Sequence, residues 1–212
     1  TEISDLVNET LGTADHTDTF SSDGWVDQDS AKIGVSSGSL AFNSNPDNSN
    51  NASSLDLGSA LSDTKWTMRY EFSPTSKNIN YATTNGYLFA GISNSASSTD
   101  MDTGQDFLGA IFGGGPTINS AEGFSSLSAP DSAGEAKPQS ALTPDDIALT
   151  WSTSTTYYVE MKRTSATAFS VELFSDSGYI TSLGKSDVTT NTSVTGLRYV
   201  KIGNLIATNS DH

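Results

Sequence analysis

The sequence predicts an all-β fold, a sandwich of two antiparallel sheets, and the clearest signal is a hairpin between residues 155 and 178. Apolar and polar side chains alternate over residues 157–162 and again over 169–173, with a small polar turn, Thr164 to Thr167, between them. A two-residue period places successive side chains on opposite faces of a sheet, so each strand has a core face and a solvent face. This is the pattern of antiparallel sheets packed in two layers.

Two further observations support the prediction. The segment Lys65–Phe72 alternates in the same way, and the apolar side chains of one face are Trp66, Met68, Tyr70 and Phe72. Apolar residues make up only 34% of the chain, yet they fall in short runs separated by Ser, Thr, Asn, Asp and Gly. Segments 87–93 and 107–112 are apolar on both faces, which predicts strands buried on two sides.

The remaining segments complete a single predicted domain over residues 1–212, with about ten to fourteen strands at sandwich spacing. Residues 1–18 are interpreted as an N-terminal extension or an edge strand, and residues 113–146, rich in Pro, Ser, Ala and Gly, as a long surface insertion with little regular structure. Other expected elements are a turn at 20–25, strands at 32–35 and 39–42, a polar loop at 43–54, an edge strand at 55–61, a return to the sheet at 147–151 and a closing strand at 196–203.

Charge and cysteine content exclude several classes of function. The 25 acidic and 10 basic residues give a formal net charge of −15, which repels a phosphate backbone and an anionic membrane surface. Nucleic acid is therefore not expected as a partner, and no apolar run reaches the roughly 18 residues of a membrane span. Cysteine is absent, which excludes disulfides, a thiol nucleophile and a cysteine zinc site.

The expected location is outside the cell, either secreted or at the cell surface. The chain begins at Thr1 rather than Met, as it would after removal of a signal peptide or after trimming of its first residues. Three N-glycosylation sequons, at Asn8, Asn51 and Asn191, suit an exported protein, although in a chain this rich in Asn, Ser and Thr a chance match is the better interpretation of each. The sequence makes no prediction of the oligomeric state.

The strand pattern resembles the concanavalin A-like lectin/glucanase superfamily, which includes laminin G-like domains. The segments that carry the resemblance are residues 20–25, 38–42, 65–72, 87–93, 105–109, 156–160 and 197–203. The resemblance implies a jelly-roll sandwich of two large antiparallel sheets and a function in glycan or matrix recognition, often with calcium. These are strand patterns rather than catalytic signatures, so the resemblance concerns the fold more than the activity.

No catalytic motif is predicted. The superfamily's laminarinase-like hydrolases carry Glu-x-Asp-x-x-Glu along one strand, and the nearest approach here is Glu2, Asp5 and Glu9. A spacing of three between Glu2 and Asp5 would put the two carboxylates on opposite faces of a strand, so we reject the match. The two histidines, His16 and His212, lie near the termini, which disfavours a Ser-His-Asp triad.

A calcium site is a candidate in the loop between the two doubly apolar strands. Asp100, Asp102 and Asp106 surround Gly104, a spacing that lets an irregular loop turn several oxygens toward one hard cation. The loop resembles the first half of a calcium loop but lacks an Asp or Asn at position 104 and a bidentate Glu beyond it. The alternative interpretation is a solvated acidic loop.

Glycan recognition requires aromatic rings beside planar polar side chains, because sugar C–H faces stack on rings while hydroxyls pair with amides and carboxylates. The outward faces of the two clearest strand regions, with the segment before the hairpin, supply such groups. The predicted ligand-binding residues are Arg69, Glu71, Trp151, Tyr158, Glu160 and Lys162. The charged members could equally be cross-strand pairs with no ligand.

The predicted function is a secreted carbohydrate-binding or adhesion domain without catalytic activity, its partner a glycan or polysaccharide and calcium a candidate structural ion. Two alternatives fit the same fold. One is a polysaccharide hydrolase or lyase that uses outward carboxylates such as Glu71 and Glu160 if their strands are neighbours. The other is a structural subunit of a virion, surface layer or filament.

Overall fold

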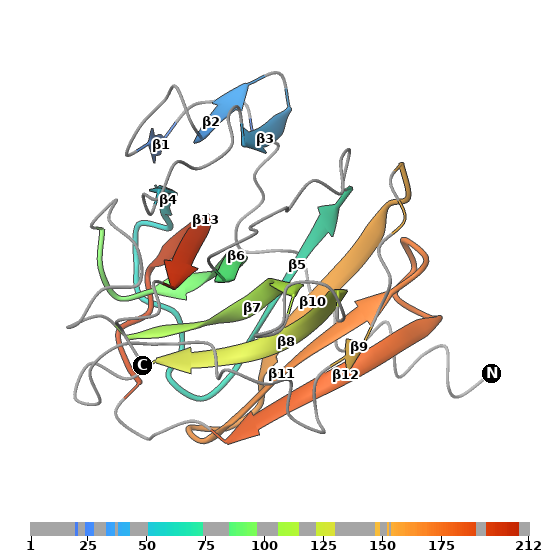
Figure 1. Ribbon diagram of the computed structural model, residues 1–212. Helices are drawn as coiled ribbons and strands as arrows, with labels where there is room; N and C mark the ends of the chain where they lie inside the picture. The colour runs from blue at the N-terminus through green and yellow to red at the C-terminus, as the bar shows by residue number, and fades with distance from the viewer. Residues whose placement is uncertain are drawn as a thin grey trace.

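The computed structural model is an all-β sandwich, and the part of the chain that it describes contains strands and no helix (Figure 1). Described are residues 20, 24–27, 33–36, 38–42, 51–73, 85–96, 106–114, 122–129, 147–148, 152, 154–189 and 194–207. No helix there is long and apolar enough to cross a membrane.

Seven strands form the larger sheet, in the order β1-β4-β13-β6-β7-β8-β9, and every pair in it is antiparallel. Their bounds are β1 Trp25–Asp27, β4 Asn51–Asp56, β13 Tyr199–Ala207, β6 Asn85–Ser93, β7 Phe107–Gly114, β8 Glu122–Ala129 and β9 Ile147–Ala148. The predicted closing strand is β13, and it lies inside the sheet between β4 and β6.

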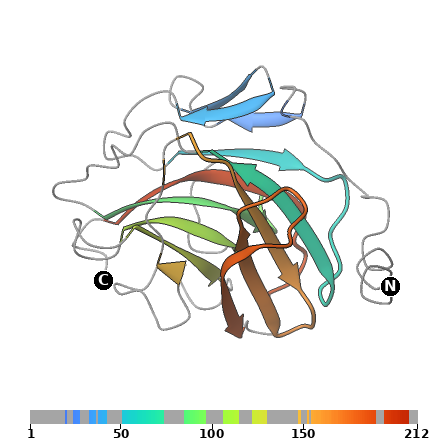
Figure 2. The same ribbon diagram turned by 90° about the vertical axis from the view of Figure 1, so that its right-hand side faces the viewer.

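The smaller sheet has the order β12-β11-β10-β5 and is also antiparallel (Figure 2). Its strands are β5 Trp66–Phe72, β10 Tyr157–Arg163, β11 Ala168–Phe174 and β12 Ser182–Thr189. A separate ribbon joins β2 Ile33–Ser36 to β3 Ser39–Phe42. Gly38 stands in the turn of this ribbon at φ 81°, a conformation that glycine adopts without a Cβ clash.

The hairpin predicted from the alternation is β10–β11, and the prediction of its core face is confirmed. Tyr157, Val159 and Met161 are at most 5% exposed, whereas the residues between them are half-buried. The turn is closed by a hydrogen bond from the Thr164 amide to the Ala168 carbonyl, and the Ser165 hydroxyl accepts from the amides of Thr167 and Ala168. Serine favours such turns because its side chain bonds nearby backbone amides.

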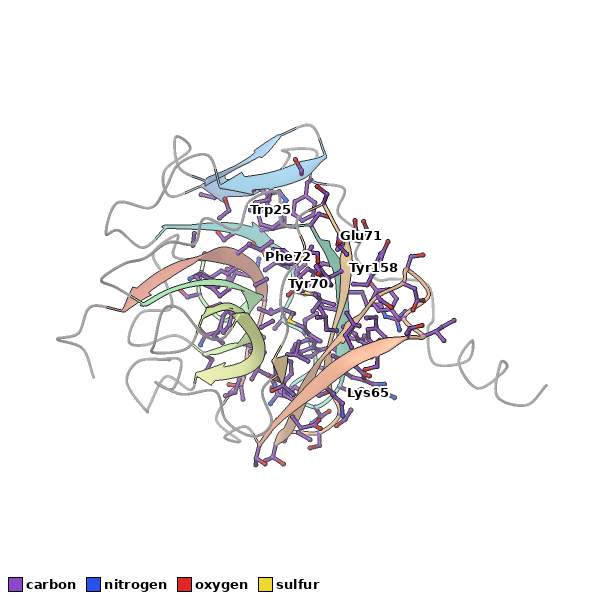
Figure 3. All side chains as sticks on the ribbon, turned by 45° about the vertical axis from the view of Figure 1, so that its right-hand side comes forward. Trp25, Lys65, Tyr70, Glu71, Phe72 and Tyr158 are labelled. Carbon is purple, nitrogen blue, oxygen red and sulfur yellow. The ribbon has the colours of Figure 1, made fainter. Side chains whose placement is uncertain are left out.

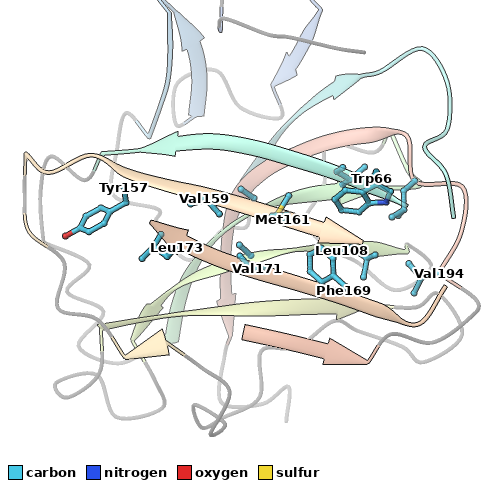
Figure 4. Close-up of a cluster of buried hydrophobic side chains, with 13 residues drawn as sticks. Trp66, Leu108, Tyr157, Val159, Met161, Phe169, Val171, Leu173 and Val194 are labelled. Atoms are coloured by element: carbon cyan, nitrogen blue, oxygen red, sulfur yellow. The ribbon is translucent and has the colours of Figure 1, made fainter. Parts of the chain in front are cut away.

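The core lies between the two sheets (Figure 4). The smaller sheet contributes the alternating residues of β5, β10 and β11, and the larger sheet contributes Ala90, Ile92, Leu108 and Ala110. Met68, Tyr70 and Phe72 pack against this cluster, as the predicted inner face of β5 requires. Both sheets therefore direct one side-chain set inward, which confirms the predicted all-β sandwich.

Three segments differ from the prediction. Residues 51–54 were expected in a polar loop before an edge strand at 55–61, but β4 spans Asn51–Asp56 and lies between β1 and β13. Ser53 and Ser54 are buried there, because the small serine side chain fits between closely packed elements.

The other two differences are strands that the sequence analysis missed. The expectation of little regular structure over 113–146 is wrong at β8, which pairs with β7 over residues 122–129. No strand was predicted at β12, a polar edge strand with Lys185 and Asp187 exposed. Charged, polar edge strands protect a sheet from pairing with another chain, and this leaves little apolar alternation to detect.

Candidate functional site

The register of β5 and β10 brings the predicted ligand-binding residues together. Arg69 lies opposite Glu160, and Glu71 lies opposite Tyr158. All four side chains alternate with the core residues of their strands, so they share the outer face of the smaller sheet. Figure 3 shows Glu71 and Tyr158 on this side, while Tyr70 and Phe72 point toward the larger sheet.

Arg69 and Glu160 form an ion pair across the two strands. Nε and Nη2 of Arg69 donate to Oε2 of Glu160 at 2.8 Å and 2.5 Å. The side chains are 29% and 14% exposed, so the pair is partly withdrawn from water. A partly buried pair is screened less by salt than a fully exposed one.

An aromatic residue that was not predicted completes the site. The ring of Tyr179, from the loop between β11 and β12, lies over the guanidinium of Arg69, with Cζ 4.1 Å from the ring centroid. It also meets Phe174 and Tyr158 edge to face, at centroid distances of 5.5 Å and 6.0 Å. We call these five residues, Arg69, Tyr158, Glu160, Phe174 and Tyr179, the outer-face cluster.

The loop that carries Tyr179 is organised by Asp176. Oδ1 of this carboxylate accepts from the amides of Gly178 and Ile180, and Oδ2 accepts from the amide of Thr181. These bonds lower the pKa of Asp176 below its ordinary value, the bond from Thr181 most of all. The Ser175 amide donates to the Thr181 carbonyl and closes the loop at its base.

Burial raises the pKa of the Tyr179 phenol, and the cation of Arg69 opposes this shift while Glu71, Glu160 and Tyr158 reinforce it. The phenol is therefore neutral over the physiological range, a hydrogen-bond donor and acceptor at the rim of the cluster. With the half-buried ring of Tyr158, it offers aromatic surface beside ionised and hydroxyl groups.

The other predicted ligand-binding residues lie outside the cluster. Lys162 is half-buried on the same face of β10, opposite Thr67 on β5 and Ser170 on β11. It is the next outward-facing residue of β10 after Glu160. Glu172 lies opposite Glu160 on the next strand and adds a carboxylate to the row. Trp151 lies outside the described residues.

Of the predicted calcium ligands, Asp100 and Asp102 lie outside the described residues. Asp106 is 3% exposed, and its Oδ2 accepts a hydrogen bond from the Thr195 amide at 2.8 Å. Its amide donates to Oδ1 of Asn94, whose own amide donates to the Asp106 carbonyl. Within the described part of the chain, no group of three or more acidic or histidine side chains is placed to hold a metal.

A second arginine of the described chain has the same types of neighbour in a different setting. Nε and Nη2 of Arg198 donate to the Asp56 carboxylate at 2.7 Å and 2.8 Å, and its Cζ lies 5.4 Å from the Tyr199 ring centroid. Arg198 and Asp56 are 38% and 46% exposed, more than Arg69 and Glu160. This trio is a natural control for the outer-face cluster.

Comparison with known proteins identifies no family. No family model matches the chain, and the search of curated proteins found no match. A solved structure of a protein of unknown function from Shewanella oneidensis MR-1 aligns with 100% of this chain and 96% of its own, at 17% identity and a TM-score of 0.45. The superfamily resemblance therefore stays a prediction.

The sequence carried only a weak signal for Tyr179. It follows Ser175-Asp-Ser-Gly178, a turn-forming run, and nothing in that run indicates that the next ring folds back over β5. Its partner Arg69 is far away in the sequence, so no local pattern joins the two residues.

Proposed function

We propose that the protein is a carbohydrate-binding or adhesion domain and that its ligand, a glycan or polysaccharide, lies on the outer face of the smaller sheet. The observation that supports this is the outer-face cluster, where two partly exposed tyrosine rings stand beside a carboxylate and a guanidinium. Rings of this kind stack on the C–H faces of sugars, and the polar groups pair with hydroxyls.

We further propose a neutral glycan rather than a sulfated or uronic one. The carboxylates of this face outnumber its cations: Glu71, Glu160, Glu172 and Asp187 stand against Arg69, Lys162 and Lys185. Arg69 is already paired with Glu160. The chain as a whole carries −15, so a polyanion would be repelled as it approached. Calcium binding at Asp100, Asp102 and Asp106, and a location outside the cell, remain further parts of the proposal.

A glycan array that includes neutral, uronic and sulfated oligosaccharides tests this function, read with and without a chelator. We expect binding to neutral oligosaccharides, reduced by Tyr158→Ala and unaffected by Tyr199→Ala. Binding that disappears with chelator would support the calcium site. No binding anywhere on the array would contradict the proposal and favour a structural subunit.

Catalysis is the second candidate, because the register makes Glu71 and Glu160 diagonal neighbours on one face. Diagonal residues of adjacent strands have Cα atoms roughly 7–8 Å apart, near the carboxylate separations of glycosidases. Glu160, however, accepts two hydrogen bonds from Arg69, and a general acid must instead carry a proton to give.

Release of reducing sugar from a mixed polysaccharide panel decides between binding and hydrolysis. A lyase is read separately, by the absorbance of its unsaturated product. Binding alone predicts no release by the wild type. Release that Glu71→Gln and Glu160→Gln both abolish would establish the catalytic alternative.

A further inference from the structure

We propose that Tyr179 contacts the ligand, and that the loop 175–181 is the rim that positions its ring. This inference rests on the proposed function, since it assigns a role within the same site. It assigns a different role to Arg69, which then acts as a positioning residue beneath the ring.

The first argument is the backbone conformation. Tyr179 has φ 55°, in the left-handed region that aromatic residues rarely occupy. Asparagine or glycine would adopt this conformation at lower cost, and either would leave the loop closed by Asp176. Strain of this kind persists where the surrounding structure enforces it and is concentrated at ligand sites.

The second argument is that the ring is held in place before any ligand arrives. Asp176 fixes the loop with three backbone hydrogen bonds, and the Tyr179 amide donates to the Asp176 carbonyl. The ring then rests on Arg69 and against Phe174. A ligand that stacks on a fixed ring pays less ordering entropy than one that must order a free side chain.

The third argument concerns which groups remain available. The guanidinium of Arg69 donates two hydrogen bonds to Glu160 and has the Tyr179 ring on one face. The rings of Tyr158 and Tyr179 stand together at the edge of the cluster, each only half-buried. The two tyrosines therefore supply the open aromatic surface, and Arg69 sets its geometry.

The matched pair of variants is Tyr179→Ala and Tyr199→Ala, each of which removes a tyrosine ring from beside an arginine. Tyr179→Asn also removes the ring, but asparagine adopts the left-handed backbone conformation readily. It therefore separates loss of the ring from misfolding of the loop. Tyr179→Phe keeps the ring and removes the hydroxyl. The probes are cellohexaose, laminarihexaose and mannohexaose, titrated by calorimetry.

We expect Tyr179→Ala and Tyr179→Asn each to weaken binding about tenfold, the size of one aromatic stacking contact. Tyr179→Phe should stay within about twofold of the wild type, because the stacking ring remains. Tyr199→Ala should bind as the wild type does. With 3-fluorotyrosine incorporated, the ¹⁹F resonance that Tyr179→Phe removes should shift on saturation with sugar.

The positioning role of Asp176 is tested by a double variant. Asp176→Ala should weaken binding in the wild-type background and have no further effect in the Tyr179→Ala background, because it acts through the ring. Its melting temperature should fall in both backgrounds. A merely structural role would lower the melting temperature without this coupling between Asp176 and Tyr179 in binding affinity.

The outcomes separate the two proposals. If the wild type binds a probe and Tyr179→Ala and Tyr179→Asn bind it equally well, the inference is wrong and the proposed function stands. If the wild type binds no probe, both the neutral-glycan function and the inference are overturned.

Discussion

The outer faces of the two sheets differ, although both sheets pack the same kind of inner face on the shared core. On the larger sheet, Phe89, Phe107 and Lys201 are at most 1% exposed, and they alternate with the core residues. On the smaller sheet, Arg69, Tyr158 and Glu160 remain partly exposed. A ligand can reach only an uncovered face, so of these two faces the smaller sheet's is the candidate site.

Glycine explains how the larger sheet closes its outer face. Gly91 and Gly109 lie opposite each other on β6 and β7, and the Phe107 ring occupies the space that their side chains would fill. Phe89 meets that ring edge to face at 5.7 Å. On the smaller sheet the corresponding layer is built from long polar side chains, which leave hydrogen-bonding groups at the surface.

Gly109→Ala should produce the largest effect, a loss of about 3 kcal/mol in the free energy of unfolding, because overpacking forces backbone and ring to move. The added Cβ would lie 2.5 Å from the Ala90 carbonyl oxygen and 2.6 Å from Cε1 of Phe107. Denaturant unfolding measures the loss. The control is Thr67→Ala on the open face, for which a change within about 0.5 kcal/mol is expected. Equal effects at the two positions would remove the contrast between the faces.

The Arg69–Glu160 and Arg198–Asp56 ion pairs test the same comparison, with a smaller expected effect on the free energy of unfolding. A double-mutant cycle of Arg69→Met and Glu160→Gln should give a coupling of about 1 kcal/mol, since both side chains are partly buried. The same cycle at Arg198 and Asp56 should give a smaller value that falls further with salt, because water screens that pair. A larger coupling free energy for Arg198 and Asp56 would mean that solvent exposure does not determine how strongly the two ion pairs stabilise the fold.

The pH dependence of the loop is the smallest expected effect. The pKa of Asp176 is lowered in the folded state, so its stabilising contribution is present above its ordinary value of 3.8 and is lost as the pH falls through the lower folded value. The protection of the Gly178 and Thr181 amides against hydrogen exchange should therefore fall in acid, while the protection of the hairpin amides does not change. In Asp176→Asn this extra acid sensitivity should be absent, while the rest of the chain unfolds at the same pH.

Much of the sandwich could be predicted because its strands alternate over short distances. The faces of β5, β10 and β11 follow from residues two apart, and the burial on both sides of β6 and β7 follows from runs of apolar residues. Strands β4 and β12 were missed because small and polar residues interrupt their apolar alternation, Asn, Ser and Asp in β4 and Ser, Gly, Lys and Asp in β12. Several of these residues are typical of turns. Their place in a sheet depends on neighbours from distant parts of the chain.

The sequence by itself determined the all-β class, the inner face of the hairpin and the outward position of Arg69, Tyr158 and Glu160, because side-chain direction in a strand is a local property. Only the tertiary structure decided that Arg69 faces Glu160 and that Tyr179 covers Arg69. Strand register and loop packing join residues far apart in the chain, and no local period encodes them. The candidate site therefore depends on which strands pair and in what register, whereas the core that supports it could be predicted from the alternation of apolar and polar residues.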